Sequence, residues 1–154
     1  MNSIKEFIKN IETGIEGTKS NGKINTSTVN LIETELGVKL PEVYKHFLHE
    51  FGSGKIGFID FLGAKPNLDI YLKTPVNIIY VNKDLREGGL NNNLIVISDS
   101  GDQEYFVLDC SKNSTTYGSI YVWNPSLSDE PIGELEYISN DLLEFLRKAL
   151  NEQL

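Results

Sequence analysis

The sequence contains one cysteine, Cys110. A single cysteine excludes an internal disulfide bond and a cysteine metal cluster. No stretch approaches the roughly twenty apolar residues that a membrane-spanning helix needs. The first residues mix acidic and basic side chains and hold no apolar run of the kind that a signal peptide carries. These absences predict a cytoplasmic protein that neither binds nor crosses a membrane.

Recognisable catalytic or metal-binding sets are also lacking. His46 and His49 lie three residues apart, but no third histidine exists to complete a zinc site. The glycines of residues 52–57 match G-x-G-x-x-G, yet they follow a predicted helix and open a strand, the reverse of a dinucleotide-binding turn. The acids near Gly101 do not match a calcium loop. We therefore expect a non-catalytic protein without cofactor or metal, and an unrecognised enzyme is the weaker alternative.

Positive charge is scarce in the last third of the chain. The formal net charge is −8. Residues 1–98 hold equal numbers of acidic and basic residues, whereas residues 99–154 hold eleven acidic residues against three basic ones. Such a surface repels nucleic acid phosphates and attracts a basic protein partner, although solubility alone would also explain it. The candidate partner-binding residues are Asp99, Asp102, Glu104, Trp123, Asp129 and Glu130.

Trp123 has two interpretations. It ends a predicted strand beside Asn124 and Pro125, where it favours packing in the core. It is also a candidate anchor of an interface, because tryptophan is over-represented among binding hot spots.

The length of 154 residues fits one domain, residues 1–154, with one core. Apolar residues at helical spacing predict an N-terminal helix from Ile4 to Ile15 and a second helix that buries Val29, Ile32 and Leu36. Thr26, Ser27 or Thr28 caps the second helix. A last helix, capped by Ser139, carries apolar residues from Leu142 to Leu150.

A short stretch between residues 36 and 54 organises the chain. Gly37 favours the left-handed conformation that ends a helix, and Pro41 suits the first turn of the next one. That next helix carries an apolar stripe that includes Tyr44 and Phe47, and Gly52 with Gly54 ends it. Such a stripe must be buried against a sheet or other helices.

The remaining pattern is mostly that of strands. β-branched and aromatic residues between turn signals predict strands, and the successive strands after residue 93 predict an antiparallel meander. The expected strands are Ile56–Leu62, Ile70–Leu72, Leu94–Ser98, Glu104–Cys110, Ser119–Asn124 and, at the edge, Glu134–Ile138. We expect an α+β fold, a mostly antiparallel sheet with helices packed on one face. Residues 74–86 are compatible with a strand or a helix.

The patterns of two blocks, Glu33 to Gly54 and Leu94 to Asp109, resemble the SUKH superfamily, which groups yeast cell-wall synthesis regulators with bacterial toxin-immunity proteins. The first is Glu33-x-x-Leu36-Gly37-x-x-Leu40-Pro41-x-x-Tyr44-x-x-Phe47-Leu48-x-x-Phe51-Gly52-x-Gly54, and the second runs from Leu94 through Gly101 and Asp102 to Leu108-Asp109. The structural signature that matches is Gly37, Leu40, Pro41, Tyr44, Phe47, Gly52, Gly54, Gly101 and Asp109. The resemblance favours a helix for residues 74–86.

The resemblance implies an immunity protein that neutralises a cognate bacterial toxin, often a nuclease, by occluding its toxic domain. Carboxylates of the acidic third would then stand in for the phosphates of the toxin's substrate. The alternative that the family offers is a regulatory or scaffolding interaction module of the cell-wall type.

Overall fold

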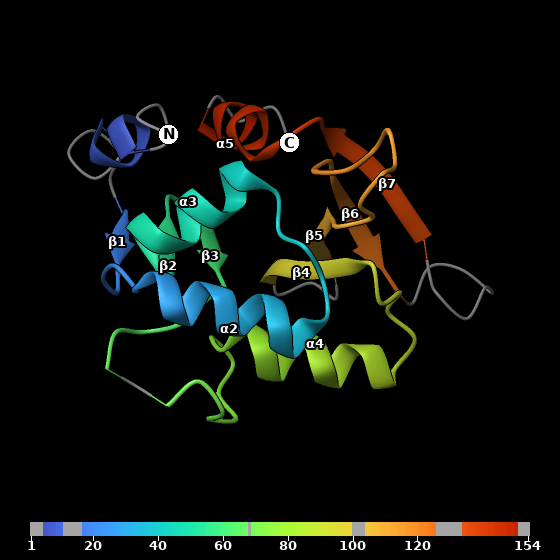
Figure 1. Ribbon diagram of the computed structural model, residues 1–154. Helices are drawn as coiled ribbons and strands as arrows, with labels where there is room; N and C mark the ends of the chain where they lie inside the picture. Colours follow the sequence, from blue (N-terminus) through green and yellow to red (C-terminus); the bar gives the residue numbers. More distant parts are fainter. Residues whose placement is uncertain (1–4, 11–16, 68, 100–103, 126–133, 151–154) are drawn as a thin grey trace.

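The chain folds into a seven-stranded antiparallel sheet with helices packed against it, and the computed structural model describes residues 5–10, 17–67, 69–99, 104–125 and 134–150. The strands follow one another across the sheet in sequence order, which confirms the predicted α+β fold (Figure 1). Besides the helical residues 5–10, the elements are β1 (Lys19–Ser20), α2 (Thr26–Leu36), α3 (Glu42–Phe51), β2 (Gly54–Ile56), β3 (Ile59–Phe61), α4 (Ile78–Glu87), β4 (Leu94–Asp99), β5 (Tyr105–Asp109), β6 (Ile120–Asn124), β7 (Glu134–Ser139) and α5 (Leu142–Leu150).

One face of the sheet is covered by α3 and α5. Phe61 of β3 packs against Phe47 of α3, with ring centroids 5.1 Å apart, and Phe106 of β5 lies 4.8 Å from Phe145 of α5. Phe61 and Phe106 share this face because both pair with Ser98 of β4. Figure 1 shows α3 crossing in front of β2 and β3, with α5 near it at the top of the molecule. We call this covered side the inner face of the sheet.

The corner between α2 and α3 is fixed by hydrogen bonds from both sides. α2 ends at Gly37, whose φ of 64° is left-handed, as predicted. The Glu33 carboxylate accepts a 2.7 Å hydrogen bond from the Leu40 N–H and lies 3.4 Å from the Lys45 ammonium. Pro41 is the N-cap of α3. The side chain of Glu33 therefore ties the end of one helix to the start of the next.

The predicted stripe of α3 is buried, and its exit from the helix requires glycine. Tyr44 and Phe47 are at most 1% exposed. Gly52 has a φ of 73°, and a Cβ there would lie 2.1 Å from the carbonyl oxygen of Gly22. A Cβ on Gly54 would lie equally close to the carbonyl oxygen of Lys19. The two signature glycines thus allow the backbone of residues 19–22 to lie close to the chain that leaves α3. The interpretation of this motif as a helix exit is confirmed.

The caps of three helices differ from the prediction. Each is an Asn or Asp whose side-chain oxygen accepts a backbone N–H of the first turn, at 2.8 to 3.0 Å. Asn25 takes the place of the predicted group Thr26, Ser27 or Thr28, and Asp141 takes the place of Ser139. Asn77 caps the helix that was predicted over residues 74–86. α4 consequently begins at Ile78 rather than near Thr74, although the predicted helix itself is confirmed.

Two strand predictions were wrong. The expected strand Ile56–Leu62 is a hairpin, because Gly57, with a φ of 60°, turns the chain between β2 and β3. Residues 70–72 form a turn instead of a strand. β1 was absent from the expected strands, and its two residues pair with β2. The other expected strands agree with β4 to β7 within a residue or so at each end.

α4 lies alongside β4, where β3 has already ended. β3 pairs with β4 only through Phe61 and Ser98. Beyond that point the buried side chain of Asn82 takes the place of a strand: its oxygen accepts the Val96 N–H at 2.6 Å, and its nitrogen donates to the Val96 carbonyl at 3.0 Å. This contact lets a helix continue the hydrogen bonding of the sheet.

Candidate functional site

The side of the sheet away from α3 and α5 carries charged side chains of β1 to β4, and we call it the open face. Register defines it, because directly paired residues of neighbouring strands point to the same side. Lys19 pairs with Lys55, and Lys55 pairs with Asp60. Further along the sheet, Asp99 pairs with Tyr105. One row of side chains across β1 to β5 therefore changes from basic to acidic to aromatic.

A groove of about 710 Å³ lies over the first half of this row. Its charged lining residues are three lysines, Lys19, Lys55 and Lys65, and two aspartates, Asp60 and Asp99. The groove is open to solvent, and its volume lies in the range of small-molecule and peptide sites.

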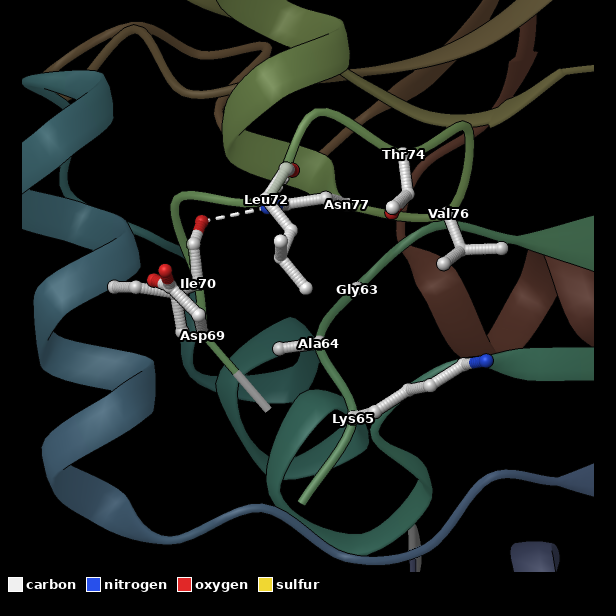
Figure 2. Close-up of a pocket in the computed structure, with 9 residues that line it drawn as sticks. All are labelled: Gly63, Ala64, Lys65, Asp69, Ile70, Leu72, Thr74, Val76 and Asn77. Carbon is white, nitrogen blue, oxygen red and sulfur yellow. Dashed lines mark hydrogen bonds between the residues drawn. The ribbon is translucent and has the colours of Figure 1, made fainter. Parts of the chain in front are cut away.

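The groove adjoins a smaller apolar cavity of about 90 Å³ under the loop that precedes α4 (Figure 2). Asn77 closes this loop by donating hydrogen bonds to the carbonyls of Ile70 and Leu72, at 2.6 and 2.7 Å. The cavity is too small for an ordinary ligand. Figure 2 shows the side chain of Lys65 running away from Asp69 and Ile70 toward the neighbouring strands, so its ammonium belongs to the groove.

The second half of the open face is aromatic. Trp123 of β6 pairs with Tyr105 and, on its other side, with Leu135 of β7. The ring centroids of Tyr105 and Trp123 lie 5.6 Å apart. In the next row, Tyr121 contacts Tyr137, whose ring is 51% exposed. Exposed Leu135 and Tyr137 make this the apolar end of the face, and β7 is the last strand of the sheet.

Acidic groups border the aromatic end. Asp99 and Glu104 flank the β4–β5 connection, at the same end of the sheet at which β6 ends and β7 begins. Burial raises the pKa of the Tyr105 hydroxyl, and the carboxylates of Asp99 and Asp84 raise it further. The shift shows that negative charge from β4 and α4 acts on this tyrosine.

The predicted partner-binding residues divide into three groups. Asp99 is exposed on the open face and lines the groove, and Glu104 is partly buried beside β5. Trp123 is only 2% exposed, which supports the interpretation that it packs in the core, where its ring lies beside that of Tyr105. Asp102, Asp129 and Glu130 lie outside the described residues, as does Gly101 of the signature.

Asp109, the last signature residue, has a structural role. Its carboxylate is 6% exposed and accepts hydrogen bonds from the Ser111 N–H at 2.8 Å and from the Thr116 hydroxyl at 2.5 Å. These bonds close the turn between β5 and β6. The strand, turn and Leu-Asp pattern of the sequence thus marks the place where the carboxylate organises the loop.

Residues with catalytic potential do not gather at the groove. His46 lies on α3 with its Nε2 4.0 Å from Glu42, and Nδ1 of His49 is buried. The Cys110 thiol is buried, and burial raises its pKa to about 12, which suppresses the thiolate that a nucleophile needs. Within the described ranges, no three His, Cys, Asp or Glu side chains are arranged to hold a metal ion.

The lysines of the groove were missed from the sequence. They come from β1, from β2 and from the turn after β3, so no local motif contains them. The position of Lys55 next to the apolar Ile56 was the one signal in the sequence that this side chain points outward, because successive side chains of a strand point to opposite faces. None of the helices in the described part of the chain is long and apolar enough to span a membrane.

Comparison with known proteins identifies a family and similar solved structures. The family model described as SUKH_6, SMI1-KNR4 cell-wall, matches residues 26–146, which include the corner, the groove lysines Lys55 and Lys65 and the aromatic end. A crystal structure of a protein from Pseudomonas syringae pv. tomato is similar with a TM-score of 0.63 and 15% identity, over 96% of each chain. At that identity the likeness concerns the fold alone. No curated protein matches the chain.

Proposed function

The chain belongs to the SUKH_6 group of SMI1-KNR4 cell-wall proteins, and from this premise we propose that it is a non-catalytic binding protein of the immunity type. In this proposal it neutralises a bacterial toxin in the cytoplasm by covering the toxic domain. The observation that carries the proposal is the open face, where charged and aromatic side chains from successive strands stand in a single row.

The open face suits the binding of a protein better than the transformation of a substrate. The groove is shallow and open, whereas an active site excludes water from its reacting groups. The aromatic end presents Leu135 and Tyr137 at the edge of the sheet, where an apolar anchor of a partner can pack. The buried ring of Trp123 packs beside that of Tyr105. Rigid strands therefore present all of these contacts.

Electrostatics favours a basic partner at the acidic end of the face. All of the net negative charge arises after residue 98. Carboxylates of Asp99 and Glu104, together with Asp102, Asp129 and Glu130, would face a basic cleft and occupy the place of substrate phosphates. A nuclease has such a cleft because its substrate is a polyanion. Occlusion needs no catalytic group on this chain.

A regulatory or scaffolding role is the second candidate, favoured by the cell-wall description of the matching family. The same open face would then bind a host protein. A toxin encoded by the gene immediately upstream of this one would favour the immunity role over the scaffolding role.

The test begins with the partner that copurifies with the chain from its native host, identified by mass spectrometry and then produced in pure form. Association rates are measured by stopped flow at several salt concentrations. At about 10 Å in water a unit charge contributes about 0.4 kcal/mol, so the variant D99N/E104Q should associate about fourfold more slowly at low salt. The difference should disappear as salt screens the charges.

The matched control is E6Q/E87Q, which removes two exposed carboxylates from the helical segment of residues 5–10 and from the end of α4. It changes the net charge equally and should alter the association rate much less. Equal slowing in both variants, or an association rate that does not respond to salt, would show that the acidic third only keeps the protein soluble.

A further inference from the structure

Three lysines meet in the groove. Lys19 and Lys55 stand directly opposite each other on β1 and β2, and Lys65 reaches the groove from the turn after β3. None of the three forms an ion pair with any of the described residues. The groove is thus a concentration of positive charge on a protein whose net charge is −8.

Four lysines elsewhere in the described residues form ion pairs. The lysines that form ion pairs each lie within 3.4 Å of a glutamate, and they are Lys23, Lys45, Lys83 and Lys148. Like charges at directly opposite positions of a sheet destabilise it. The pairing of Lys19 with Lys55 is therefore a cost to the fold. The pairing of Lys55 with Asp60 offsets part of this cost, and a bound anionic group would offset more of it.

The other side of the groove is acidic. Asp60 follows Lys55 in the row, and Asp99 lines the groove from β4. Strands lie about 4.8 Å apart, so the centre of the lysines and the centre of the aspartates are separated by roughly 10 Å. A compact polyanion such as a phosphate cluster would meet both signs of charge in this space. An extended peptide spans the same distance in about three residues.

We propose that the groove binds an extended segment of a partner protein in which carboxylates lie about three positions from a basic residue. The carboxylates lie against Lys19, Lys55 and Lys65, and the basic residue lies against Asp60 and Asp99. This inference rests on the proposed function, because it describes how the partner is held. It adds that a partner attracted by the acidic end inserts one of its own segments into the groove. The charges along this segment are opposite in sign to the groove residues that they face.

The first experiment uses a fluorescein-labelled synthetic peptide of eight residues with two glutamates near one end and two lysines near the other. Fluorescence anisotropy should show saturable binding to the full chain, and the backbone amides of Lys19, Lys55 and Lys65 should shift in NMR spectra. The variant K19Q/K55Q should bind the peptide about five- to tenfold more weakly, as expected for the loss of two exposed ion pairs. Its melting temperature shows that it is folded.

The matched control is K39Q/K112Q, which removes two exposed lysines away from the groove and should bind the peptide like the unmodified protein. Equal weakening in both double variants would reveal only general attraction and overturn the proposal. Displacement of the peptide by an equal concentration of inorganic phosphate would assign the lysines to a small anion and also overturn it. A peptide in which glutamates and lysines alternate should bind less tightly, and equal affinity would refute the order of charges.

The natural partner separates this inference from the proposed function. Glu104 does not line the groove, so its single variant tests the acidic end alone. A partner that binds K19Q/K55Q as tightly as the unmodified chain, but loses association rate with Glu104→Gln, refutes the groove and leaves the binding function standing. A partner that binds K19Q/K55Q more weakly, but associates with Glu104→Gln at the unmodified rate, supports the groove and refutes the electrostatic role given to the acidic end.

Discussion

The joint between α4 and β4 depends on one polar side chain, and its replacement tests how the sheet is completed. Asn82 and Val96 are both fully buried. The Asn82 carboxamide makes three hydrogen bonds, one to the Ile78 carbonyl of its own helix and two to the backbone of Val96. Replacement of Asn82 by leucine keeps roughly the same volume but removes all three bonds.

The expected loss follows from the groups that are left without partners. The N–H and the carbonyl of Val96 both point toward the missing carboxamide, and an unsatisfied buried group costs about 1 to 3 kcal/mol. Two such groups give a loss of about 2 to 6 kcal/mol in the free energy of unfolding. Asn82→Ala should lose less than Asn82→Leu, because the smaller side chain leaves room for a water molecule to bond Val96.

Urea denaturation followed by circular dichroism measures the loss, and hydrogen exchange of the Val96 amide locates it. The control is Asn30→Leu, an exposed position of α2 where the change should be less than about 0.5 kcal/mol. A loss below about 1 kcal/mol for Asn82→Leu, with the Val96 amide still protected, would refute the view that α4 replaces a strand beside β4.

Two further predictions concern the core. Phe47 is fully buried between Phe51 and Phe61, so Phe47→Ala should cost about 3 to 5 kcal/mol in urea denaturation, and a loss well under 1 kcal/mol would place the α3 stripe outside the core. Because burial raises the pKa of the Cys110 thiol to about 12, an increase from pH 7 to pH 9 should speed its reaction with a disulfide reagent in the unfolded chain but not in the folded one. Equal acceleration in both states would contradict the buried position of this thiol.

Long periodic segments could be predicted from the sequence because packing reinforces their pattern. The stripe of α3 and the strands β4 to β6 contain enough apolar residues to define one period. β1 has only two residues, so no period can be read from it. The β2–β3 hairpin looked like one strand because Phe58, at its turn, is an aromatic residue that the structure leaves 69% exposed.

The caps were missed for a different reason. Thr26, Ser27 and Thr28 all have hydroxyl groups that can cap a helix, and the sequence alone did not show that the preceding Asn25 would accept the bond. For α4, Pro75 follows Thr74 in the order typical of a helix start, yet both lie before Asn77, whose side chain also closes the loop over the small cavity. Tertiary contacts of the capping side chain decided that start.

The candidate site was only half visible for a topological reason. The acidic residues cluster in the sequence after residue 98, so a count of charges found them. The groove lysines lie within residues 1–98, where the numbers of acidic and basic residues are equal, so the count of charges did not reveal them. Only the pairing of β1 with β2 brings Lys19 and Lys55 together. Charge balance within a segment therefore does not mean charge balance on a surface.

The signature glycine of β2 connects the family pattern with the groove. Gly54 pairs with Ser20, and its missing side chain lets the Lys19 carbonyl approach to a distance that any Cβ would block. A shift of β1 by one residue would turn Lys19 to the inner face, because side chains alternate along a strand. The close approach at Gly54 fixes the register that places Lys19 opposite Lys55. Gly54, which the sequence presents only as a residue that ends a helix, thus also determines where the positive charge of the open face lies.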